Sequence, residues 1–323
     1  MRAYLVRRTL LGLLTIFLVS LFIFVILRVV PGDVVTLIMG EAEGPVGAAT
    51  GAYAQRLERL RQELGLADPV QVQFAKWLWD LVRLEPGTSF TTMRPVMTLV
   101  KEAYPVTIQL TIVAFTLTIA LALVVGILSA LRQDSWLDYA LRVFTIGGLS
   151  MPNFWVGTLL ILGLAIGIGY MPPPGYIPPT EDFWASAQQF TLPGLVLAWR
   201  SSAILGRMIR SSMLEVLRED YVRTAWAKGL AQSTIVVRHM LKNAALPVVT
   251  IMGFQLATLF SGTTVIEVVF GLPGVGRLLV ESIRGRDYPT IQFLVMVFAV
   301  VVVFVNIAVD ILYAWLDPRV AYR

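Results

Sequence analysis

The stretch 103-AYPVTIQLTIVAFTLTIALALVVGILSAL-131 runs for 29 residues without an Asp, Glu, Lys or Arg. A helix needs about 20 mostly apolar residues to cross the ~30 Å hydrocarbon layer of a bilayer. Because this stretch exceeds that length, it predicts a helix that spans a membrane. Five other windows lack the four charged residue types, and they cover residues 9–27, 143–180, 183–199, 243–266 and 288–309. The sequence therefore predicts an all-α integral membrane protein with six transmembrane helices.

Two of the six windows need other signals to set the ends of their helices. The window 143–180 is too long for one span, and we expect Met171-Pro-Pro-Pro-Gly175 to end its helix near Tyr170. The window 183–199 is short and contains two adjacent glutamines, so we expect its helix to start near Leu192. A helix with one apolar stripe and one polar stripe is typical of a span that faces a cavity rather than lipid.

The composition of the 323-residue chain supports the same fold class. Hydrophobic residues make up 57% of the chain and charged residues 15%, and the mean hydropathy is +0.74. Soluble domains carry roughly 25% charged residues, so an ordinary soluble protein is excluded. The absence of cysteine excludes a disulfide scaffold and a thiolate nucleophile. The net charge of +5 does not indicate nucleic-acid binding, because the placement of Lys and Arg matters more than their sum in a membrane protein.

The placement of the basic residues predicts the orientation of the spans. With the N-terminus inside, 14 of the 26 basic residues and six acidic ones fall in the cytoplasmic segments 1–8, 132–142, 207–242 and 317–323. Ten basic and fourteen acidic residues fall in the external segments 31–102, 171–191 and 267–287. The positive-inside rule therefore places both termini in the cytoplasm. We expect the first window to be a retained helix, because its 19 charge-free residues exceed the roughly 7–15 of a signal peptide.

The residues needed for several kinds of chemistry are missing from the chain. A phosphate-binding loop needs a Gly-Lys pair, and the sequence contains none, so we expect ATP to be bound by another chain. Zinc hydrolysis needs two histidines four residues apart, and His239 is the single histidine. The Gly-x-Ser-x-Gly turn of serine hydrolases is also absent. We therefore expect no catalytic residue, no metal and no cofactor, which argues against an intramembrane enzyme.

The external segment 31–102 carries the pattern of two amphipathic helices. Residues 40–51 are rich in Gly and Ala and predict a flexible loop, and residues 53–64 predict the first helix. Asp68-Pro69 predicts the start of the second helix. One face of that helix carries Phe74, Trp77, Leu78 and Leu81. We expect a small helical cap packed on the spans, with a lid or a helix pair on the bilayer surface as alternatives.

The cytoplasmic segment before the fifth window carries the most informative motif. It reads Tyr221-Val-Arg-Thr-Ala-Trp-Ala-Lys-Gly229, and Arg238-His-Met-Leu-Lys-Asn-Ala-Ala-Leu-Pro247 follows. This pair resembles the conserved loop of ABC-importer permeases, and in particular that of the peptide/nickel branch. Gly229 is suited to end a helix in a left-handed turn, and we expect Leu246-Pro247 to form a turn where the fifth span begins. Seven other stretches resemble the same family in chain order: Arg28-Val-Val-Pro-Gly-Asp33, Leu64-Gly-Leu-Ala-Asp-Pro69 with Gln73-Phe-Ala-Lys-Trp77, Gly87-Thr-Ser-Phe90, Ser150-Met-Pro-Asn-Phe-Trp155, Phe270-Gly-Leu-Pro-Gly-Val-Gly-Arg277, Arg286-Asp-Tyr-Pro289 and Asp317-Pro-Arg319.

The resemblance implies the role of a non-catalytic subunit with the type I ABC-importer permease fold. It implies pairing with a second homologous permease, two ATPase subunits below the membrane and an extracytoplasmic substrate-binding protein, in the bacterial inner membrane. The long external segment is similar to that of the first of the two permeases. Peptides are the substrate class we expect, with nickel chelates or glutathione as alternatives. The resemblance implies that contact with the ATPase is made by Glu219, Tyr221, Arg223, Thr224, Ala225, Ala227, Lys228 and Gly229.

Polar residues within or beside the spans are candidates for the translocation pathway, because burying them in lipid is costly. These candidates are Asn153, Arg200, Gln255 and Glu267. A self-contained secondary transporter is the competing interpretation, but no internal repeat is visible and the cytoplasmic loop would be unexplained. The expected organisation is an N-terminal span (1–30), an external helical segment (31–102), a five-helix core (103–316) that includes the coupling loop (215–243), and a cytoplasmic tail (317–323).

Overall fold

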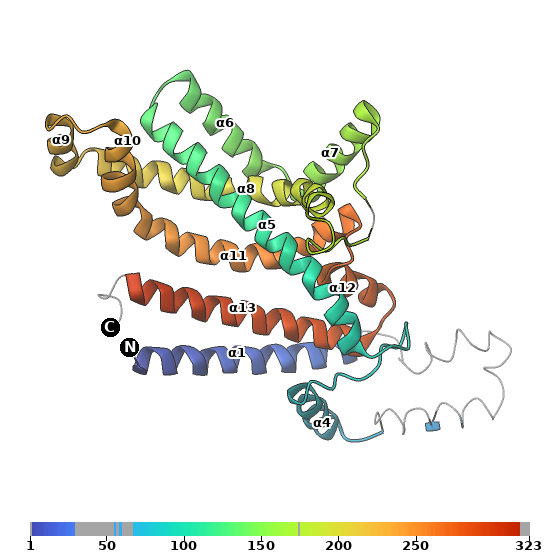
Figure 1. Cartoon of the computed structure of the whole chain (residues 1–323). Helices are drawn as coiled ribbons and strands as arrows, with labels where there is room; N and C mark the ends of the chain where they lie inside the picture. Colours follow the sequence, from blue (N-terminus) through green and yellow to red (C-terminus); the bar gives the residue numbers. More distant parts are fainter. Residues whose placement is uncertain (1, 30–54, 56–57, 60–66, 174, 317–323) are drawn as a thin grey trace. The chain divides into compact units, whose positions relative to one another are not determined.

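The computed structural model describes residues 2–29, 55, 58–59, 67–173 and 175–316 (Figure 1). Helices dominate these residues, and they contain a single isolated β-bridge between Thr88 and Pro95. The helices are α1 (Arg2–Val29), α4 (Val70–Val82), α5 (Val96–Leu131), α6 (Trp136–Ser150), α7 (Asn153–Ile168), α8 (Phe183–Leu217), α9 (Asp220–Ala227), α10 (Gln232–Thr234), the π-helix η1 (Ile235–Leu241), α11 (Lys242–Phe270), α12 (Val275–Arg284) and α13 (Tyr288–Leu316). The predicted loop 40–51, most of the predicted helix 53–64 and the tail 317–323 lie outside the described residues.

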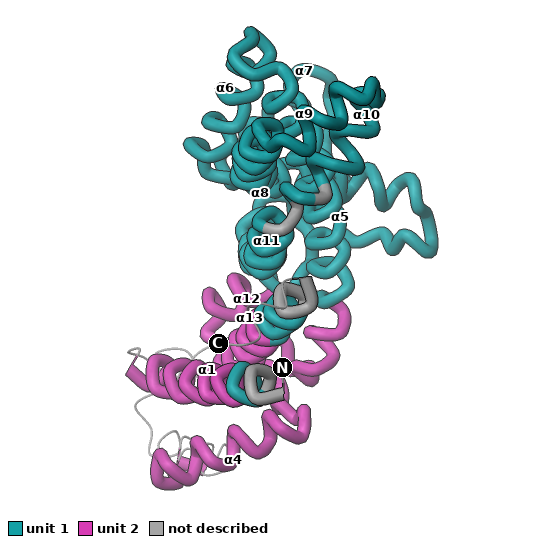
Figure 2. Tube along the Cα trace, turned by 90° about the vertical axis from the view of Figure 1, so that its left-hand side faces the viewer, with its two compact units in different colours: residues 1–9, 103–277, 304–323 teal, residues 10–102, 278–303 magenta. Residues whose placement is uncertain are grey.

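The chain divides into two compact units (Figure 2). Unit 1 comprises Met1–Thr9, Ala103–Arg277 and Phe304–Arg323, and unit 2 comprises Leu10–Glu102 and Leu278–Val303. Three long helices, α1, α5 and α13, contribute residues to both units. The candidate sites described below all lie in unit 1.

Four described helical segments are long and apolar enough to cross a membrane, and a bent pair makes a fifth. The four are Val6–Val29, Val96–Leu131, Pro247–Phe270 and Tyr288–Ile311. The fifth candidate is α6 together with α7, which meet at an angle of 107°. Of the six predicted windows, 183–199 falls short of this test because its helix, α8, carries several polar residues. With 35 residues at 1.5 Å each, α8 is nevertheless long enough to span a bilayer.

The predicted helix end near Tyr170 is confirmed, because α7 ends at Ile168, but two other features of these windows differ from expectation. The window 143–180 is not one continuous helix, because the chain breaks at Met151-Pro152. A residue before proline is pushed out of the helical region, and Met151 is extended with φ −97° and ψ 131°. The other error concerns α8, which begins at Phe183 rather than near Leu192. The side chain of Asp182 caps it by accepting a hydrogen bond from the Ala185 amide at 3.0 Å.

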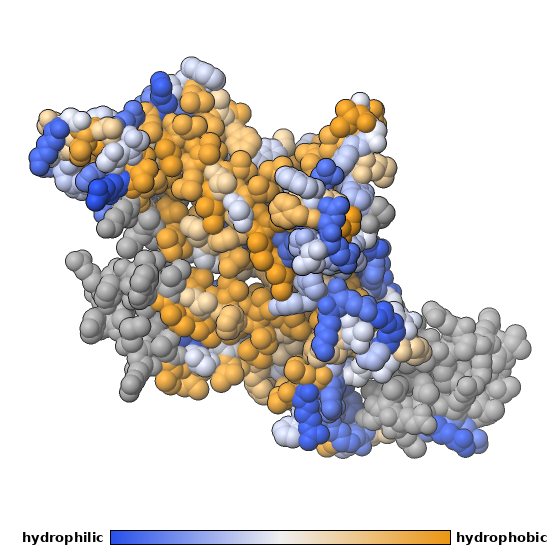
Figure 3. Space-filling model, in the orientation of Figure 1, coloured by the Kyte–Doolittle hydropathy of each residue, from blue (hydrophilic) through white to orange (hydrophobic). Residues whose placement is uncertain are grey.

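Unit 1 is built around α8, which packs against α6 and α11. Its contact with α5 is close because Gly126 has no side chain. A Cβ at that position would lie 2.6 Å from the Ile209 Cβ and 2.8 Å from the Gly206 carbonyl oxygen. Small residues at helix crossings are the usual way for membrane helices to pack tightly. Apolar side chains cover much of the visible surface of these helices, and hydrophilic ones gather around α9 and α10 (Figure 3).

Unit 2 contains most of the first span and the helix that follows it along the chain. The predicted helix after Asp68-Pro69 is confirmed as α4, and the predicted aromatic stripe faces α1. The ring of Phe24 lies 5.0 Å from that of Phe74 and 5.7 Å from that of Trp77, measured between centroids. This packing favours the helical cap among the three alternatives for the segment. The N-cap was predicted at Asp68 but lies at Pro69, so the helix starts one residue later than predicted. The Asp68 carboxylate instead pairs with Lys76 at 2.6 Å.

Candidate functional site: a coupling loop and candidate pathway residues

The helix α9 is held on the core of unit 1 by one edge. Val222 and Ala225, three residues apart, are 0% and 5% exposed. They belong to one apolar cluster with residues from the end of α8, from η1 and from α11, namely Ile209, Met213, Ile235, Met240 and Ala244. Burying this edge ties the orientation of α9 to three helices of unit 1. A force applied to α9 would therefore reach α8 and α11 directly.

The opposite face of α9 is open to solvent. All the predicted contact residues except Ala225 are exposed, namely Glu219, Tyr221, Arg223, Thr224, Ala227, Lys228 and Gly229. Trp226, which the sequence analysis left out of the contact set, is 44% exposed on the same helix. Exposed Trp and Tyr side chains are typical of interface hot spots, and α9 carries one of each. Its aromatic character in a charged loop was the signal that would have found it.

The predicted left-handed turn at Gly229 is confirmed. Gly229 has φ +74°. Its amide donates to the Trp226 carbonyl at 3.0 Å, and the Leu230 amide donates to the Ala225 carbonyl at 3.3 Å. This pair of hydrogen bonds is the Schellman motif, which satisfies the last carbonyls of a helix. A side chain at position 229 would meet nothing within 4 Å, so the glycine is needed for its backbone conformation and not for space.

The predicted turn at Leu246-Pro247 was wrong, because Pro247 lies inside α11, which starts at Lys242. Proline has no amide hydrogen to donate, so α11 lacks one backbone hydrogen bond at Pro247 but continues through it. The π-helix η1 leads directly into α11, and π-helical turns are frequent at functional sites. The side chain of Asn243 links the region to α9 by donating to the Tyr221 hydroxyl at 2.9 Å and to the His239 carbonyl at 2.8 Å.

Among the four pathway candidates, Glu267 sits in a closed polar cluster and is 0% exposed. Its carboxylate accepts a hydrogen bond from the Thr107 hydroxyl at 2.7 Å and another from the Arg277 amide at 3.0 Å. The Thr107 hydroxyl oxygen in turn accepts from the Val275 amide at 2.9 Å. Glu267 and Thr107 thus hold the first amides of α12 against α5 and α11. The carboxylate is satisfied within unit 1.

The other three candidates have separate surroundings. Gln255 on α11 is buried, and its amide reaches the Ser201 carbonyl of α8 at 3.4 Å. Arg200 is exposed and donates to the Leu149 carbonyl at 3.3 Å. Asn153 is the half-buried first residue of α7. In the described part of the chain, no hydrogen bond or ion pair joins any two of the four. Their role in a pathway stays a prediction.

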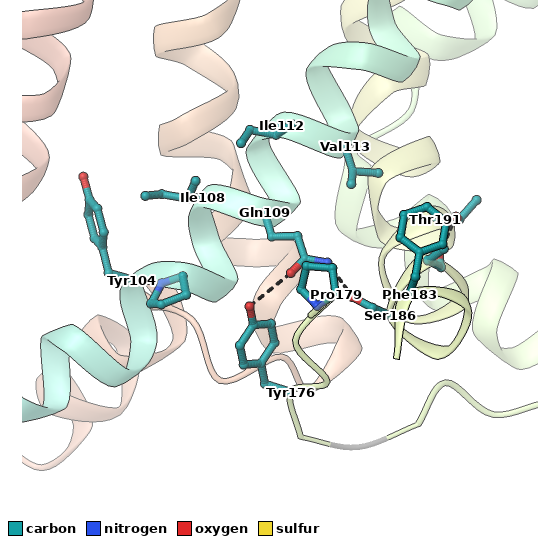
Figure 4. A pocket seen from close by; sticks show the side chains of 12 residues that line it. Tyr104, Ile108, Gln109, Ile112, Val113, Tyr176, Pro179, Phe183, Ser186 and Thr191 are labelled. Atoms are coloured by element: carbon teal, nitrogen blue, oxygen red, sulfur yellow. Dashed lines mark hydrogen bonds between the residues drawn. The ribbon is translucent and has the colours of Figure 1, made fainter. Parts of the chain in front are cut away.

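A pocket of about 630 Å³ opens beside the first half of α5 (Figure 4). Its lining is mostly apolar and includes Ile108, Ile112, Val113, Pro179 and Phe183. One polar group crosses it, because the Gln109 side chain accepts from the Tyr176 hydroxyl at 3.1 Å and donates to Ser186 at 2.7 Å (Figure 4). A large apolar pocket with a few convergent polar groups is the usual form of a ligand site. The sequence analysis missed it, although Gln109 is the one amide side chain in the apolar run 103–131.

Long apolar helices together with an exposed loop anchored on their core are the architecture of a transport permease. In the described residues, no group of three or more His, Asp or Glu is placed to hold a metal ion. Residues 122–322 match the family described as binding-protein-dependent transport system inner membrane component, and residues 1–111 match its N-terminal family. The chain belongs to this family and is a multi-pass permease subunit of an ABC importer.

Named relatives match over the full length of the chain. The oligopeptide transport system permease protein AppB of Bacillus subtilis is 38% identical over 100% of both chains. The dipeptide transport system permease protein DppB of Alkalihalophilus pseudofirmus is 36% identical over the same coverage. The glutathione transport system permease protein GsiC of Escherichia coli is 37% identical over 99% of both chains. In fold, 68% of the chain aligns with 97% of a chain of the methionine transporter MetNI in an inward-facing conformation, with a TM-score of 0.56 at 16% identity.

Proposed function

We propose that this permease imports peptides, with a second homologous permease, two ATPase subunits and an extracytoplasmic binding protein. The names of the full-length relatives support peptides as the substrate class, because two of the three named above carry dipeptides or oligopeptides. Glutathione is the second candidate, since the third relative is a glutathione permease. Each of the two permeases contributes half of the pathway. The ATPase subunits bind and hydrolyse ATP, and this chain is the non-catalytic part.

The observation that carries the proposal is the two-sided construction of α9. Its exposed side chains, which include Tyr221 and Trp226, dock in a groove on an ATPase subunit. Its buried edge, Val222 and Ala225, packs on the core of unit 1. When the ATPase pair closes on ATP, the docked helix moves as a rigid body and carries α8 and α11 with it. The left-handed turn at Gly229 fixes the end of α9, so that the helix moves without unwinding at its C-terminus.

The orientation and the pathway form part of the same proposal. Both termini and the segment 215–243 face the cytoplasm, and residues 31–102 face outward. Asn153, Arg200, Gln255 and Glu267 are the candidate pathway residues of the core 103–316. The pocket at Gln109 is placed at the outer end of α5, where it would receive an apolar side chain of the peptide.

Uptake of a labelled dipeptide tests the proposal in cells that carry the transporter as their single peptide importer. Labelled glutathione and a nickel chelate are run in parallel. Uptake of the dipeptide alone would support peptides as the substrate class. Uptake of glutathione alone would instead support glutathione, the second candidate. Uptake that persists when both ATPase subunits are deleted would contradict the importer mechanism itself.

A Trp226→Ala variant tests the docking face. We expect at least a tenfold loss of uptake and loss of ATPase subunits from the purified complex, because truncating an interface hot spot costs about 2 kcal/mol or more. The matched control is Trp79→Ala, which removes a similarly exposed Trp from α4 in unit 2. If both variants keep their uptake and their ATPase subunits, α9 is not the coupling element.

A further inference from the structure

A buried carboxylate organises the start of α6. Asp138 is 0% exposed and accepts hydrogen bonds from the Ser129 hydroxyl, from the Asp134 amide and from Arg210. Arg210 binds it in bidentate fashion, with Nε 3.0 Å from Oδ1 and Nη2 2.8 Å from Oδ2. Two parallel hydrogen bonds of this kind form a charge-assisted ion pair between the guanidinium and the carboxylate. Both oxygens of the carboxylate therefore accept hydrogen bonds from these partners.

A second arginine, Arg142, approaches the same carboxylate but is not satisfied by it. Its Nη2 lies 3.1 Å from Asp138 Oδ2. Neither Nη2 nor Nε has a hydrogen-bond partner, although both atoms are buried. The side chain as a whole is 39% exposed, so part of its guanidinium faces outward. These two donors are enclosed, so an anion at the surface would meet the exposed remainder of the Arg142 side chain, and a guanidinium is suited to bind a phosphate.

The surroundings of Arg142 carry excess positive charge. Arg142, Arg207 and Arg210 line one small cleft with Ser129 and Thr145. Asp138 neutralises one of the three arginines, and the exposed Asp134 lies 3.7 Å from Arg142. The cleft measures about 10 Å³, room for about one water molecule. An anion would therefore lie at its mouth, against the exposed parts of Arg142 and Arg207.

The outward face of α6 indicates what kind of anion reaches this mouth. Val143 and Ile146 are more than half exposed on a helix of a membrane protein, as lipid-facing side chains are. One and two turns earlier, Tyr139 and Trp136 are also exposed. Exposed Trp and Tyr beside basic residues are typical of the level of the lipid headgroups. Arg142 lies at the boundary between this aromatic pair and the apolar part of α6.

We propose that Arg142 and Arg207 bind the phosphate of an anionic phospholipid in the cytoplasmic leaflet. The cytoplasmic side rests on the orientation in the proposed function. The acyl chains would lie along Val143 and Ile146, and the aromatic pair would flank the headgroup. Basic pockets between membrane helices on the cytoplasmic side are suited to anionic headgroups. The lipid would brace α6 and, through the Asp138–Arg210 pair, the part of α8 that leads to α9.

Lipid retention by the purified transporter complex tests the proposal. The complex is delipidated, offered phosphatidylglycerol or phosphatidylcholine, and examined by native mass spectrometry. We expect the wild-type complex to retain phosphatidylglycerol preferentially. Arg142→Gln with Arg207→Gln should weaken this binding by about fivefold for each arginine. Arg142→Lys keeps the charge and should restore most of it. Arg284→Gln, an exposed arginine in the last turn of α12, is the matched control.

Three results would overturn the proposal. The first is equal retention of phosphatidylglycerol by the wild type and by the double variant. The second is inorganic phosphate competing as well as the lipid at equal concentration, which would make the site one for free phosphate. The third is loss of ATPase subunits from the double variant in every lipid, which would make the arginines a protein contact. Because retention is measured without peptide or ATP, failure of the proposed substrate leaves this test unaffected.

Discussion

The loop around α9 and the cluster around Glu267 are both polar parts of unit 1, and their polar groups have opposite fates. In α9, the charged and aromatic side chains are exposed, and only Val222 and Ala225 are buried. In the cluster, the carboxylate of Glu267 is fully enclosed and its hydrogen bonds end on Thr107 and Arg277. The sequence marked the loop as functional through its resemblance to a permease motif, and it marked Glu267 through its polar character beside a span. Burial distinguishes exposed side chains that are available to a partner protein from a buried carboxylate whose hydrogen bonds are already made within the chain.

The largest expected effect on stability comes from removing the buried carboxylate of Glu267. In Glu267→Ala, the Thr107 hydroxyl and the Arg277 amide lose their acceptor inside a buried site. We expect the free energy of unfolding to fall by about 3 kcal/mol or more, because each orphaned buried donor costs about 1–3 kcal/mol. Thermal unfolding of the purified complex and the level of the chain in membranes measure it. Glu267→Gln, which keeps an acceptor oxygen, should lose less.

The control for this prediction lies at the other end of the comparison. Glu219 is exposed at the start of α9 and its side chain caps no amide there. Glu219→Ala should therefore change the unfolding free energy by less than about 0.5 kcal/mol. Equal stability of the two alanine variants would contradict the role of the buried carboxylate. Loss of uptake in Glu267→Gln at wild-type stability would instead assign Glu267 to the pathway.

A smaller effect is expected within α9 itself, where two alanines two residues apart face different surroundings. Ala225 is in the apolar cluster with Ile209 and Met213, and Ala227 is exposed. Ala225→Leu should lower the unfolding free energy by about 2 kcal/mol, because extra methylenes strain a packed core. Ala227→Leu should leave it within about 0.5 kcal/mol. Thermal unfolding of the two variants measures this difference, and equal shifts would mean that α9 is not anchored by this edge.

The sequence predicted well those features that depend on local pattern. Charge-free runs identified the long helices, the stripe that contains Phe74 and Trp77 identified α4, and Gly229 identified the end of α9. Each of these follows from hydrophobic period or backbone preference within a few residues. The same reasoning failed at two prolines, because a proline can either break a helix or lie within it. Pro152 breaks a window that looked continuous, whereas Pro247 lies within α11 where a turn was expected.

Long-range contacts account for what could not be predicted. Thr107 and Glu267 are 160 residues apart in the chain, and no local pattern links them. The same holds for Gln109 and Tyr176 in the pocket and for Asp138 and Arg210. The burial of Ala225 could not be predicted from the sequence either. A small residue in a short amphipathic helix is suited both to contact a partner and to pack inside its own chain. Tertiary packing decides such cases.

The next effect in size concerns the end of α9. Gly229→Ala places a Cβ where nothing lies within 4 Å, so no clash is expected. The cost is the left-handed backbone, about 1 kcal/mol for a residue other than glycine. We expect a small drop in thermal stability together with a larger loss of ATP-driven uptake, because the Schellman turn sets the direction of α9. Uptake at the wild-type rate would show that the turn does not matter for coupling.

The smallest effect on stability is expected at Arg223. Its contact with Asp220 spans 3.6 Å between two highly exposed side chains. Such pairs contribute little in water, so Arg223→Gln should change the unfolding free energy by less than about 0.5 kcal/mol. If Arg223 instead meets an acidic rim on an ATPase subunit, the variant loses ATPase subunits during purification, and more so as salt is raised. Asp220→Asn is the matched variant, because it removes the other half of the pair but leaves the arginine for the partner. Loss of ATPase subunits in both variants to the same extent would show that the internal pair, and not the contact of Arg223 with a partner, is what the loop requires.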